Sequence, residues 1–524
     1  MHLVLLAAGL ISLYLLYVML TRAPPRAPLP PGPKPLPIIG NLRDMPAPDS
    51  PDWLHWLKHK DLYGPISTVA VPGQRLIILN DAKAAHELLE KRSLIYSDRP
   101  GSPFASLCGM GDTVLMQGYG KRLRTYRQYI HHEIGTHHAV TRFNQSQDTE
   151  VRRFLIRLLE TPEHLHEHAR GLAGAFILKV LYGYHMDYTS NDPLLDFIEE
   201  ALKGFIAALI PGTWLVDAVP VLRHLPAWCP GAGFRRTAQQ LREELQFLAD
   251  LPFGFVKDQI DAGSNEASYV SSLLKDKDTL PGSKVEHEIK WTAVSLYFGG
   301  ADTTVSTIAT FFLAMVLYPD VQKRAQEEID RVVGRGRLPG FSDRANLPYI
   351  NAVVKEALRW HPVAPMGVAH SSMEDDTYDG YHIPKGSIIL PNVWAFCHDP
   401  KDYKDPMSFK PERFLGDNPE RDPHFVFGYG RRICPGRILA ESNLFLTIAT
   451  SLAAFDIGKP VCNGQEVDVR ASFLPGIISH PVPFEMNIKM RDLKYGELIR
   501  SVEKEHPWET KDADLVRRKL SGQQ

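Results

Sequence analysis

The chain has 524 residues, of which 44% are hydrophobic, and a formal net charge of −2 at pH 7. This near-neutral balance gives no electrostatic basis for nucleic-acid binding. The five cysteines (Cys108, Cys229, Cys397, Cys434 and Cys462) are widely scattered and form no CxxC pair, which argues against a disulfide framework or a zinc site.

The first predicted element is a membrane anchor over residues 1–21. No charged residue occurs from Leu3 to Leu20, a run just long enough for a membrane helix. No Lys or Arg precedes it, whereas Arg22 and Arg26 follow it, which favours a retained anchor over a cleaved signal peptide. These basic residues predict a cytosolic orientation for the rest of the chain, at the endoplasmic reticulum membrane in a eukaryotic cell.

A proline-rich hinge is predicted over residues 22–41. Eight prolines lie between Pro24 and Pro37, so this stretch cannot be helical. It is expected to be a stiff extended spacer between the anchor and the globular body.

One large domain, mainly α with small β-sheets, is predicted over residues 42–488. Ile66 to Leu79 has the pattern of a β-hairpin turning at Pro72-Gly73-Gln74, and Ala82 to Lys91 that of a short helix. Helical periodicity dominates from Leu155 onward, with no repeat or second linker. The polar tail, 489–524, carries no recognisable function.

A long apolar helix is predicted from about Val285 to Leu317, with Gly299 and Gly300 in its middle. Each glycine costs about 1 kcal/mol against alanine, so something should pack against this backbone. Asp302 and Thr303 follow as an acid and alcohol pair that can hold water and pass protons into a dry pocket. In the alternative interpretation, Thr303 bonds to a backbone carbonyl and Asp302 faces solvent.

The segment from Phe427 to Gly436 surrounds Cys434 with the features that a haem-binding thiolate requires. Phe427 can cover the sulfur, Gly430 allows a positive φ, and Pro435 suits the first turn of a helix whose N-terminal end favours the negative sulfur. Gly436 permits close approach of a flat ligand. The alternative is a buried structural cysteine beside a loop.

This segment resembles the haem-binding signature of the cytochrome P-450 family, Phe-x-x-Gly-x-Arg-x-Cys-x-Gly, at all five fixed positions. The resemblance implies a cytochrome P-450 fold and a haem b whose iron takes the thiolate of Cys434 as its axial ligand. The haem-contacting residues that it implies here are Cys434, Arg432, Phe427, Gly436 and Gly300.

The segment Gly299 to Thr304 is similar to the family motif Ala/Gly-Gly-x-Asp/Glu-Thr-Thr/Ser, which lies in the helix that crosses the distal haem face. The resemblance implies O2 as co-substrate, protonation of bound oxygen through Thr303, and supply of those protons by Asp302. Together with the Cys434 segment, this similarity favours the functional interpretation of the pair.

Glu356 and Arg359 lie three residues apart in the predicted helix Asn351 to Trp360, and therefore on one face. They match the family's Glu-x-x-Arg pair, and Arg413 matches the arginine that joins it from a Pro-Glu-Arg-Phe segment. The implied role of this triad is structural, locking the loop that carries Cys434.

The resemblance is imperfect where haem propionates are bound. After Tyr119-Gly120, the family usually has Trp-x-x-x-Arg, but Leu123 stands at the tryptophan position here. Arg127 then becomes the main predicted contact from this helix, helped by Arg124. His370 falls where relatives place a propionate-binding residue; the alternative for both is a solvated surface position.

A lipophilic substrate is implied by the apolar residues at the family's pocket positions. Core packing explains any single one of them equally well. Ile206 to Trp228 is an apolar, proline-punctuated stretch that can dip into a bilayer, and it is similar to the corresponding segment of fungal members in secondary metabolism. The pocket candidates are Phe104, Leu107, Met110, Leu296, Met366, Val368, Phe473 and Leu474.

No flavin or dinucleotide-binding fingerprint is present, so electrons are expected from a separate NADPH-cytochrome P-450 reductase. Lys121, Arg122, Lys410 and Arg431 are candidates for a basic docking face, although a generic solvated surface explains them as well.

Histidine clusters elsewhere do not predict a metal site. His132 and His137 are five residues apart rather than four and do not share a helical face. His164, His166 and His168 lie in a polar helical context, where a solvated face is the simpler interpretation.

Three functions follow from these patterns. The leading one is a membrane-anchored haem-thiolate monooxygenase that hydroxylates or epoxidises a terpenoid, polyketide or polycyclic aromatic. The alternative is an isomerase, dehydratase or peroxygenase that needs no reductase, but such chemistry has no use for an acid and alcohol proton relay. A haem carrier or gas sensor would leave the anchor and the helix glycines without purpose.

Overall fold

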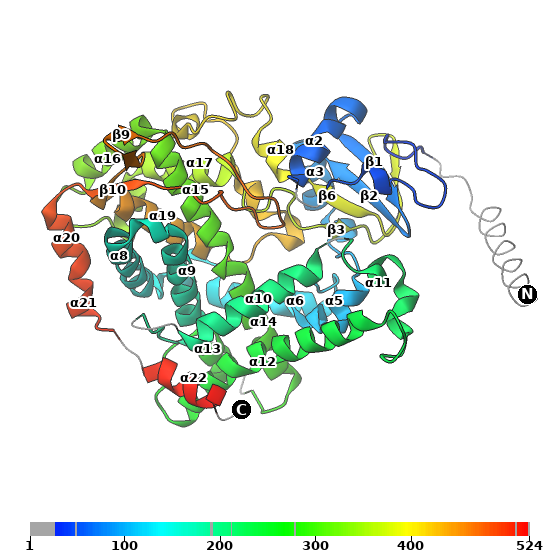
Figure 1. Cartoon of the computed structure of the whole chain (residues 1–524), viewed down its shortest axis with the longest axis horizontal. Coiled ribbons are helices and arrows are strands. Elements are labelled where there is room, and N and C mark those ends of the chain that lie inside the picture. Colours follow the sequence, from blue (N-terminus) through cyan, green and yellow to red (C-terminus); the bar gives the residue numbers. More distant parts are fainter. Residues whose placement is uncertain are drawn as a thin grey trace, which may run out of the picture.

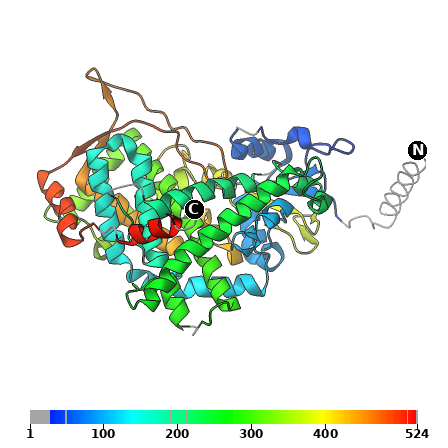
Figure 2. The ribbon, with the colours of Figure 1, turned by 60° about the horizontal axis from the view of Figure 1, so that its bottom comes forward.

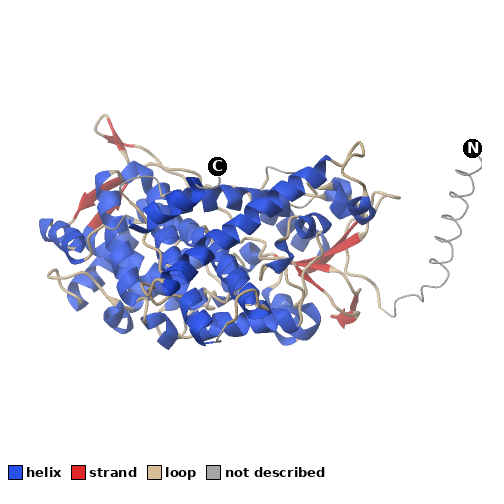
Figure 3. Ribbon diagram, turned by 90° about the horizontal axis from the view of Figure 1, so that it is seen from below, coloured by secondary structure: helices blue, strands red, loops and turns tan. Residues whose placement is uncertain are grey.

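The computed structural model describes residues 27–47, 50–188, 192–210, 212–276, 279–508 and 511–521. The predicted anchor, 1–21, and the first residues of the hinge lie outside the described residues. Helices form the body, and the strands lie at its two ends (Figure 3). This arrangement matches the predicted class, mainly α with small β-sheets.

The hairpin predicted from Ile66 to Leu79 is present. β1 (Ile66–Val71) and β2 (Gln74–Leu79) pair antiparallel with Val71 opposite Gln74, so that Pro72 and Gly73 form a two-residue turn. Gly73 has a φ of +75°, a conformation that glycine adopts without strain. β6 (Ile388–Pro391) pairs parallel with β2, and β3 (His370–Ser371) completes a sheet of order β1-β2-β6-β3.

The remaining strands form three small ribbons. β10 pairs with β7, β4 with β5, and β8 with β9, all antiparallel. Their bounds are β4 (Asp376–Tyr378), β5 (Tyr381–Ile383), β7 (Phe455–Gly458), β8 (Val461–Cys462), β9 (Gln465–Glu466) and β10 (Asn487–Met490).

Long helices make up the body between the two strand-bearing ends (Figure 1). They are α2 (Asp52–Tyr63), α6 (Lys121–Ile134), α8 (Asn144–Glu160), α9 (Leu165–Tyr182), α10 (Pro193–Leu209), α12 (Gly233–Asp261), α13 (Tyr269–Asp276), α14 (Lys284–Ala301), α15 (Thr303–Leu317), α16 (Pro319–Val332), α17 (Pro348–Trp360) and α19 (Arg437–Ala454).

Shorter turns connect these helices. Short α-helices are α3 (Ala82–Ala85), α4 (Ser93–Tyr96), α5 (Pro103–Leu107), α7 (His137–Thr141), α11 (Leu215–Ala218) and α18 (Val393–Cys397). The 3₁₀ segments are η1 (Leu42–Asp44), η3 (Met110–Asp112), η4 (Pro162–His164), η5 (Pro220–His224), η6 (Phe341–Asn346), η7 (Pro411–Phe414), η8 (His424–Phe427) and η9 (Gly430–Arg432); η2 (His86–Lys91) is a π-helical turn that continues α3.

The predicted apolar helix runs through the body as α14 and α15, with a break at Asp302. The stretch Lys284–Leu317 is long and apolar enough to cross a membrane, but 72% of its most apolar window is buried against the rest of the protein. It contacts α6, α9 and α12 before the break, and α9, α17 and α19 after it. It is therefore the central core helix.

The described part of the hinge is not a free spacer. Thr68 of β1 donates its N–H to the carbonyl of Pro31 (2.9 Å), and Asn41 bonds to Ala70 through both its backbone N–H (2.6 Å) and its side-chain carbonyl (2.9 Å). A Cβ at Gly32 would lie 1.9 Å from the carbonyl oxygen of Thr68, so the two backbones touch. The segment from Pro31 to Asn41 therefore packs along the edge of β1.

The polar tail also folds onto the body. The predicted boundary at residue 488 falls inside β10, and three helices follow: α20 (Leu493–Arg500), α21 (Val502–Glu505) and α22 (Lys511–Ser521). α20 and α21 pack against α8, and α22 packs against α10. Figure 1 shows α22 in red at the lower end of the molecule, beside α12 and α13.

Candidate active site

Cys434 lies in a loop that leads into α19. Its backbone N–H donates to the carbonyl of Phe427 (2.7 Å), which closes the loop. Gly430 has the predicted positive φ (+50°), and a Cβ there would lie 2.7 Å from the carbonyl oxygen of Leu89. α19 begins at Arg437, so Pro435 precedes the helix rather than lying in its first turn as predicted.

Burial raises the pKa of the Cys434 thiol, while the backbone N–H of Gly436 and the charges of Arg127 and Arg437 act in the opposite direction. All three favour a thiolate, the form of cysteine that binds metals. A Cβ at Gly436 would meet open space, which leaves room for a flat ligand at this point.

Two arginines beside this loop carry positive charge without a carboxylate partner among the described residues. Arg432 is buried and donates to the carbonyl oxygens of Ser97 (2.7 Å), Gln117 and Val114 (3.4 Å). Arg99 donates to those of Leu115 (3.2 Å), Val368 (3.0 Å) and Ala369 (2.6 Å). A buried charge is costly unless an opposite charge compensates it, so these two arginines favour the binding of an anion here.

The charges of this pocket repel one another. Burial and the charge of Arg432 lower the pKa of Arg99 to about 9, and burial lowers that of Arg432 to about 10. Burial and the charge of Arg99 lower the pKa of His370 to about 3, and its Nδ1 bonds to the carbonyl of Tyr96 (2.7 Å). His370 is thus buried beside Arg99 and Arg432 and is not a solvated surface residue, and its contact with a propionate stays a prediction. Sequence reasoning missed Arg99, whose only signal is the Asp-Arg-Pro sequence after α4.

Arg127 contacts the Cys434 loop directly. Its guanidinium donates to the carbonyl of Ile433 (2.9 Å), one residue before the cysteine. Arg124 instead is exposed and lies over the ring of Tyr119 (5.9 Å), so it does not help Arg127 in the pocket. Leu123 is buried in the core and supplies no hydrogen-bond donor at the tryptophan position.

Replacing Arg127 with leucine is expected to speed haem loss about tenfold, because a charge-assisted contact of about 1.5–3 kcal/mol disappears. Transfer of haem to excess apomyoglobin measures this rate. Arg124→Leu on the same helix is the control and should leave the rate unchanged; equal rates in both variants would remove Arg127 from the haem site.

The predicted acid and alcohol pair lies at the break between α14 and α15. Thr303 Oγ1 donates to the carbonyl of Gly299 (2.7 Å), as the alternative interpretation expected. Asp302 does not face solvent, since its carboxylate lies 3.2 Å from Nε2 of His480. The alternative interpretation is therefore right for Thr303, which bonds to a backbone carbonyl, and wrong for Asp302, whose carboxylate contacts His480.

The two glycines have different surroundings. A Cβ at Gly300 would lie 3.1 Å from Cδ1 of Ile177, so Gly300 allows α9 to pack closely. A Cβ at Gly299 would meet nothing within 4 Å, and the carbonyl of this residue accepts from Thr303. Gly299 thus borders open space beside Asp302 and Thr303, whereas Gly300 packs against α9. The sequence analysis gave both glycines the same role.

The triad comes together as predicted. Glu356 accepts two hydrogen bonds from Arg359 (2.7 and 2.9 Å), one from Nε of Arg413 (3.1 Å) and one from the backbone N–H of Lys410 (2.7 Å). All three side chains are at most 2% exposed. Arg359 also donates to the carbonyls of Cys397 and Pro406 (2.8 Å each), so the triad holds the segment that precedes the Cys434 loop.

The predicted pocket residues have varied environments. Phe104 is fully buried and stacks on Trp214 (ring centroids 3.6 Å apart), and Phe473 stacks on His361 (3.5 Å). Core packing accounts for these two. Met110 and Leu296 are buried in the same cluster as α14, and Leu107, Met366, Val368 and Leu474 are half-buried or exposed.

Two of the predicted docking cations are already paired. Arg122 bonds to Asp112 (2.6 Å) and Lys410 to Asp405 (2.5 Å). Lys121 and Arg431 are exposed, and Arg431 lies 5.4 Å from the ring centroid of Tyr119. Arg431 and Arg124 thus flank one tyrosine on the surface next to the Cys434 loop.

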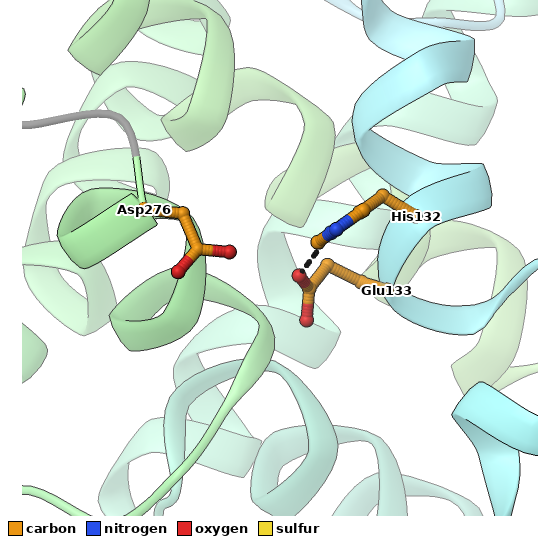
Figure 4. A group of neighbouring side chains, drawn as sticks. All are labelled: His132, Glu133 and Asp276. Carbon is orange, nitrogen blue, oxygen red and sulfur yellow. Dashed lines mark hydrogen bonds and ion pairs between the residues drawn. The ribbon is translucent and has the colours of Figure 1, made fainter.

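One histidine cluster lies close to carboxylates. Figure 4 shows His132 and Glu133 of α6 facing Asp276 at the end of α13, with possible ligand atoms within 4.8 Å of one another. Glu133 already bonds to His132 (2.8 Å) and to Arg142. Glu133 is the only buried carboxylate of these three residues, and Arg142 neutralises it. We therefore interpret the cluster as a network of ion pairs.

Comparison with known proteins assigns the family. The Cytochrome P450 family profile matches residues 30–488. Cytochrome P450 monooxygenase ppsD of Aspergillus oryzae is 49% identical, over 93% of this chain and 94% of its own length. Cytochrome P450 monooxygenase claR of Ampulloclitocybe clavipes is 47% identical (97% and 94%), and the O-methylsterigmatocystin oxidoreductase of Aspergillus flavus is 41% identical (99% and 98%).

The chain belongs to the cytochrome P450 family, and it is a monooxygenase of the oxidoreductase class. Proteins of this family bind haem through a cysteine thiolate and use O2. The cations Arg99, Arg432 and Arg127 fit the two propionates of such a group, and Cys434 is the cysteine whose surroundings favour a thiolate.

Proposed function

We propose that this protein is anchored in the endoplasmic reticulum membrane and oxidises a lipophilic secondary metabolite with electrons from a separate NADPH-cytochrome P-450 reductase. The observation that carries the proposal is the uncompensated cation pocket beside Cys434, together with an intact acid and alcohol pair at the break in the core helix. The reaction is a hydroxylation or an epoxidation.

The bound haem supplies an iron centre that activates dioxygen, and the protein supplies protons and shape. Thr303, whose hydroxyl donates to the carbonyl of Gly299 in this structure, passes protons inward. Asp302 replaces each proton that Thr303 gives up. Arg99, Arg127 and Arg432 hold the propionates, and Cys434 holds the iron.

Exposed apolar side chains at one end of the molecule support the proposed contact with a membrane and a lipophilic substrate. The connection from α10 to α12 exposes Leu215, Val221 and Trp228, the last to 82%, and Ile38 in the segment before α2 is 96% exposed. Figure 2 shows both segments at the same end of the molecule. An open hollow of about 270 Å³ lies there, between the β1 to β2 turn and α11. Exposed apolar groups at one end indicate contact with a bilayer.

The substrate class follows from the apolar candidates Met110, Leu296, Met366 and Val368 and from the relatives. One of these relatives is named for the oxidation of O-methylsterigmatocystin, a small molecule. We propose a terpenoid, polyketide or polycyclic aromatic of similar character. For electron transfer, Lys121, Arg124 and Arg431 form the exposed basic surface beside the Cys434 loop.

The spectrum of the reduced protein with carbon monoxide tests the haem site. The full-length protein should show the Soret band at the family's namesake wavelength, and Cys434→Ser should lose it. The matched control is Cys462→Ser, which changes an exposed cysteine on β8 and should keep the band. A normal band in Cys434→Ser would assign the axial ligand to another residue.

Product analysis tests the reaction. The protein in membranes, with reductase and NADPH, should convert members of a panel of terpenoids, polyketides and polycyclic aromatics to products with one added oxygen atom. Omission of the reductase should abolish conversion. Conversion without reductase and NADPH would instead establish an isomerase, dehydratase or peroxygenase.

A further inference from the structure

Asp302 is oriented by a residue from a distant part of the chain. Its Oδ2 lies 3.2 Å from Nε2 of His480, which belongs to the segment between β9 and β10. Ser306 in α15 donates to the carbonyl of Ser479 (2.6 Å), and this bond fixes the segment beside the helix break. The segment is thus fixed to α15 at Ser306, one helical turn after Asp302, and this bond places His480 beside the Asp302 carboxylate.

The proton on His480 can be assigned. An ionised carboxylate only accepts hydrogen bonds, so Nε2 carries the hydrogen that is donated to Asp302. Nδ1 of the same ring is buried and has no partner among the described residues. The ring thus donates through Nε2, and among the described residues its single polar contact is the one to Asp302.

A second histidine and an arginine complete the surroundings of the carboxylate. The ring of His166, from the first turn of α9, lies 5.4 Å from the ring of His480, and Arg170 Nη2 lies 3.2 Å from Nε2 of His166. Glu167 on the same turn is exposed. The charged groups that act on the Asp302 carboxylate are His480 from the C-terminal segment and Arg170 and His166 from α9, and Glu167 acts in turn on His166.

The electrostatics of this cluster keep Asp302 ionised. Burial alone would raise the pKa of Asp302, but the hydrogen bond and charge of His480, with the charges of Arg170 and His166, hold it below the ordinary value. Half-buried His166 in the first turn of α9 adjoins exposed Glu167, so this end of α9 borders solvent.

We propose that His480 is the positioning residue of the proton path, holding the Asp302 carboxylate, whose side chain is 19% exposed, beside His166 and Arg170, where it takes protons from solvent before passing them to Thr303. The inference rests on the proposed function, since it assumes that Asp302 feeds Thr303. For each proton consumed, one proton moves from solvent water to the carboxylate, and one moves from the carboxyl group to Thr303 Oγ1 as that hydroxyl gives its own proton to the dioxygen that electrons from NADPH reduce. Asp302 then returns to His480 as the anion.

Coupling of NADPH use to product formation tests the role. His480→Phe keeps an aromatic ring but removes the donor, and it should lower product formed per NADPH about tenfold, with the electrons recovered as hydrogen peroxide. His480→Gln retains an N–H donor and should stay within about twofold of the unmodified protein. His164→Gln, an exposed change on η4, is the matched control and should have no effect.

The infrared carboxyl band of the resting holoprotein gives a measurement that is independent of turnover. The band assigned to Asp302 by its loss in Asp302→Asn should appear at a pH about one unit higher in His480→Phe, because the hydrogen bond and charge of His480 no longer oppose the effect of burial on the pKa of Asp302. The acid limb of the coupling profile should move in the same direction. An unchanged band and unchanged coupling in His480→Phe would overturn the inference, whereas full coupling in Asp302→Asn would overturn the proton role of Asp302 itself.

Discussion

Replacing Glu356 with alanine should give protein that neither retains haem nor folds stably. Two buried guanidinium groups, those of Arg359 and Arg413, would lose their shared carboxylate, and the N–H of Lys410 would lose its acceptor. Removal of one partner of a buried ion pair costs about 3–5 kcal/mol. A typical protein has only about 5–15 kcal/mol of stability in total, so a large part of it would disappear.

The triad reaches the haem site through backbone. Arg359 and Arg413 together bind the carbonyls of Cys397, Lys404 and Pro406, in the segment that leads to the Cys434 loop. If that segment loosens, the loop loses its fixed position, and haem content should fall with stability. Haem content per protein and the unfolding temperature measure the two effects.

The control for this prediction is a pair with the same spacing on the surface. Lys203 and Glu200 lie 2.9 Å apart in α10, three residues apart, with side chains 72% and 77% exposed. Glu200→Ala should change stability by less than about 0.5 kcal/mol, because solvent screens exposed pairs. Full haem content in Glu356→Ala would contradict the structural role of the triad.

The change Val516→Asp in α22 should loosen the helices α10 and α12. Val516 and Ala513 are fully buried, Asp512 accepts from the N–H of His185 (2.9 Å), and Arg517 pairs with Asp187 (2.8 Å). Burial of one valine contributes about 1.5–3 kcal/mol, and a buried carboxylate without a partner adds to the loss. α22 should therefore detach from α10.

Hydrogen exchange measured by mass spectrometry would detect this change. Hydrogen exchange in α10 and α12 should speed up. The haem spectrum should stay normal, because in the described part of the chain α22 packs against α10 and not against the Cys434 loop. Arg518→Asp, an exposed change in the same helix, is the matched control and should leave exchange unaltered. Unaltered exchange in Val516→Asp as well would mean that α22 does not restrain these helices.

Local sequence patterns were sufficient to predict features that depend on one short stretch of chain. The turn at Pro72 and Gly73 and the positive φ at Gly430 each depend on residues within one stretch of chain. Helical spacing placed Glu356 and Arg359 on one face, and the resemblance to the family's Glu-x-x-Arg and Pro-Glu-Arg-Phe segments identified the triad. Such features are set by backbone geometry, and sequence reasoning reaches them.

Contacts between distant polar segments were not predictable in this way. His480 lies 178 residues from Asp302 in sequence, and no spacing rule connects them. The polar composition of the tail gave no sign that Val516 and Ala513 are buried, because only four of the 11 residues of α22 are apolar, and they produce only a weak pattern. Arg99 was missed for the same reason: its partners are backbone carbonyls, which leave no trace in residue identity.

The repulsion between the Arg99 and Arg432 guanidinium groups has a consequence for how the protein is made in the cell. A cluster of buried cations opposes folding of the empty chain, and a dianionic ligand that binds only the folded state removes this penalty. Cofactor supply during synthesis should thus govern how much protein survives quality control. Cells fed a haem precursor should accumulate more of this enzyme without any change in its messenger RNA.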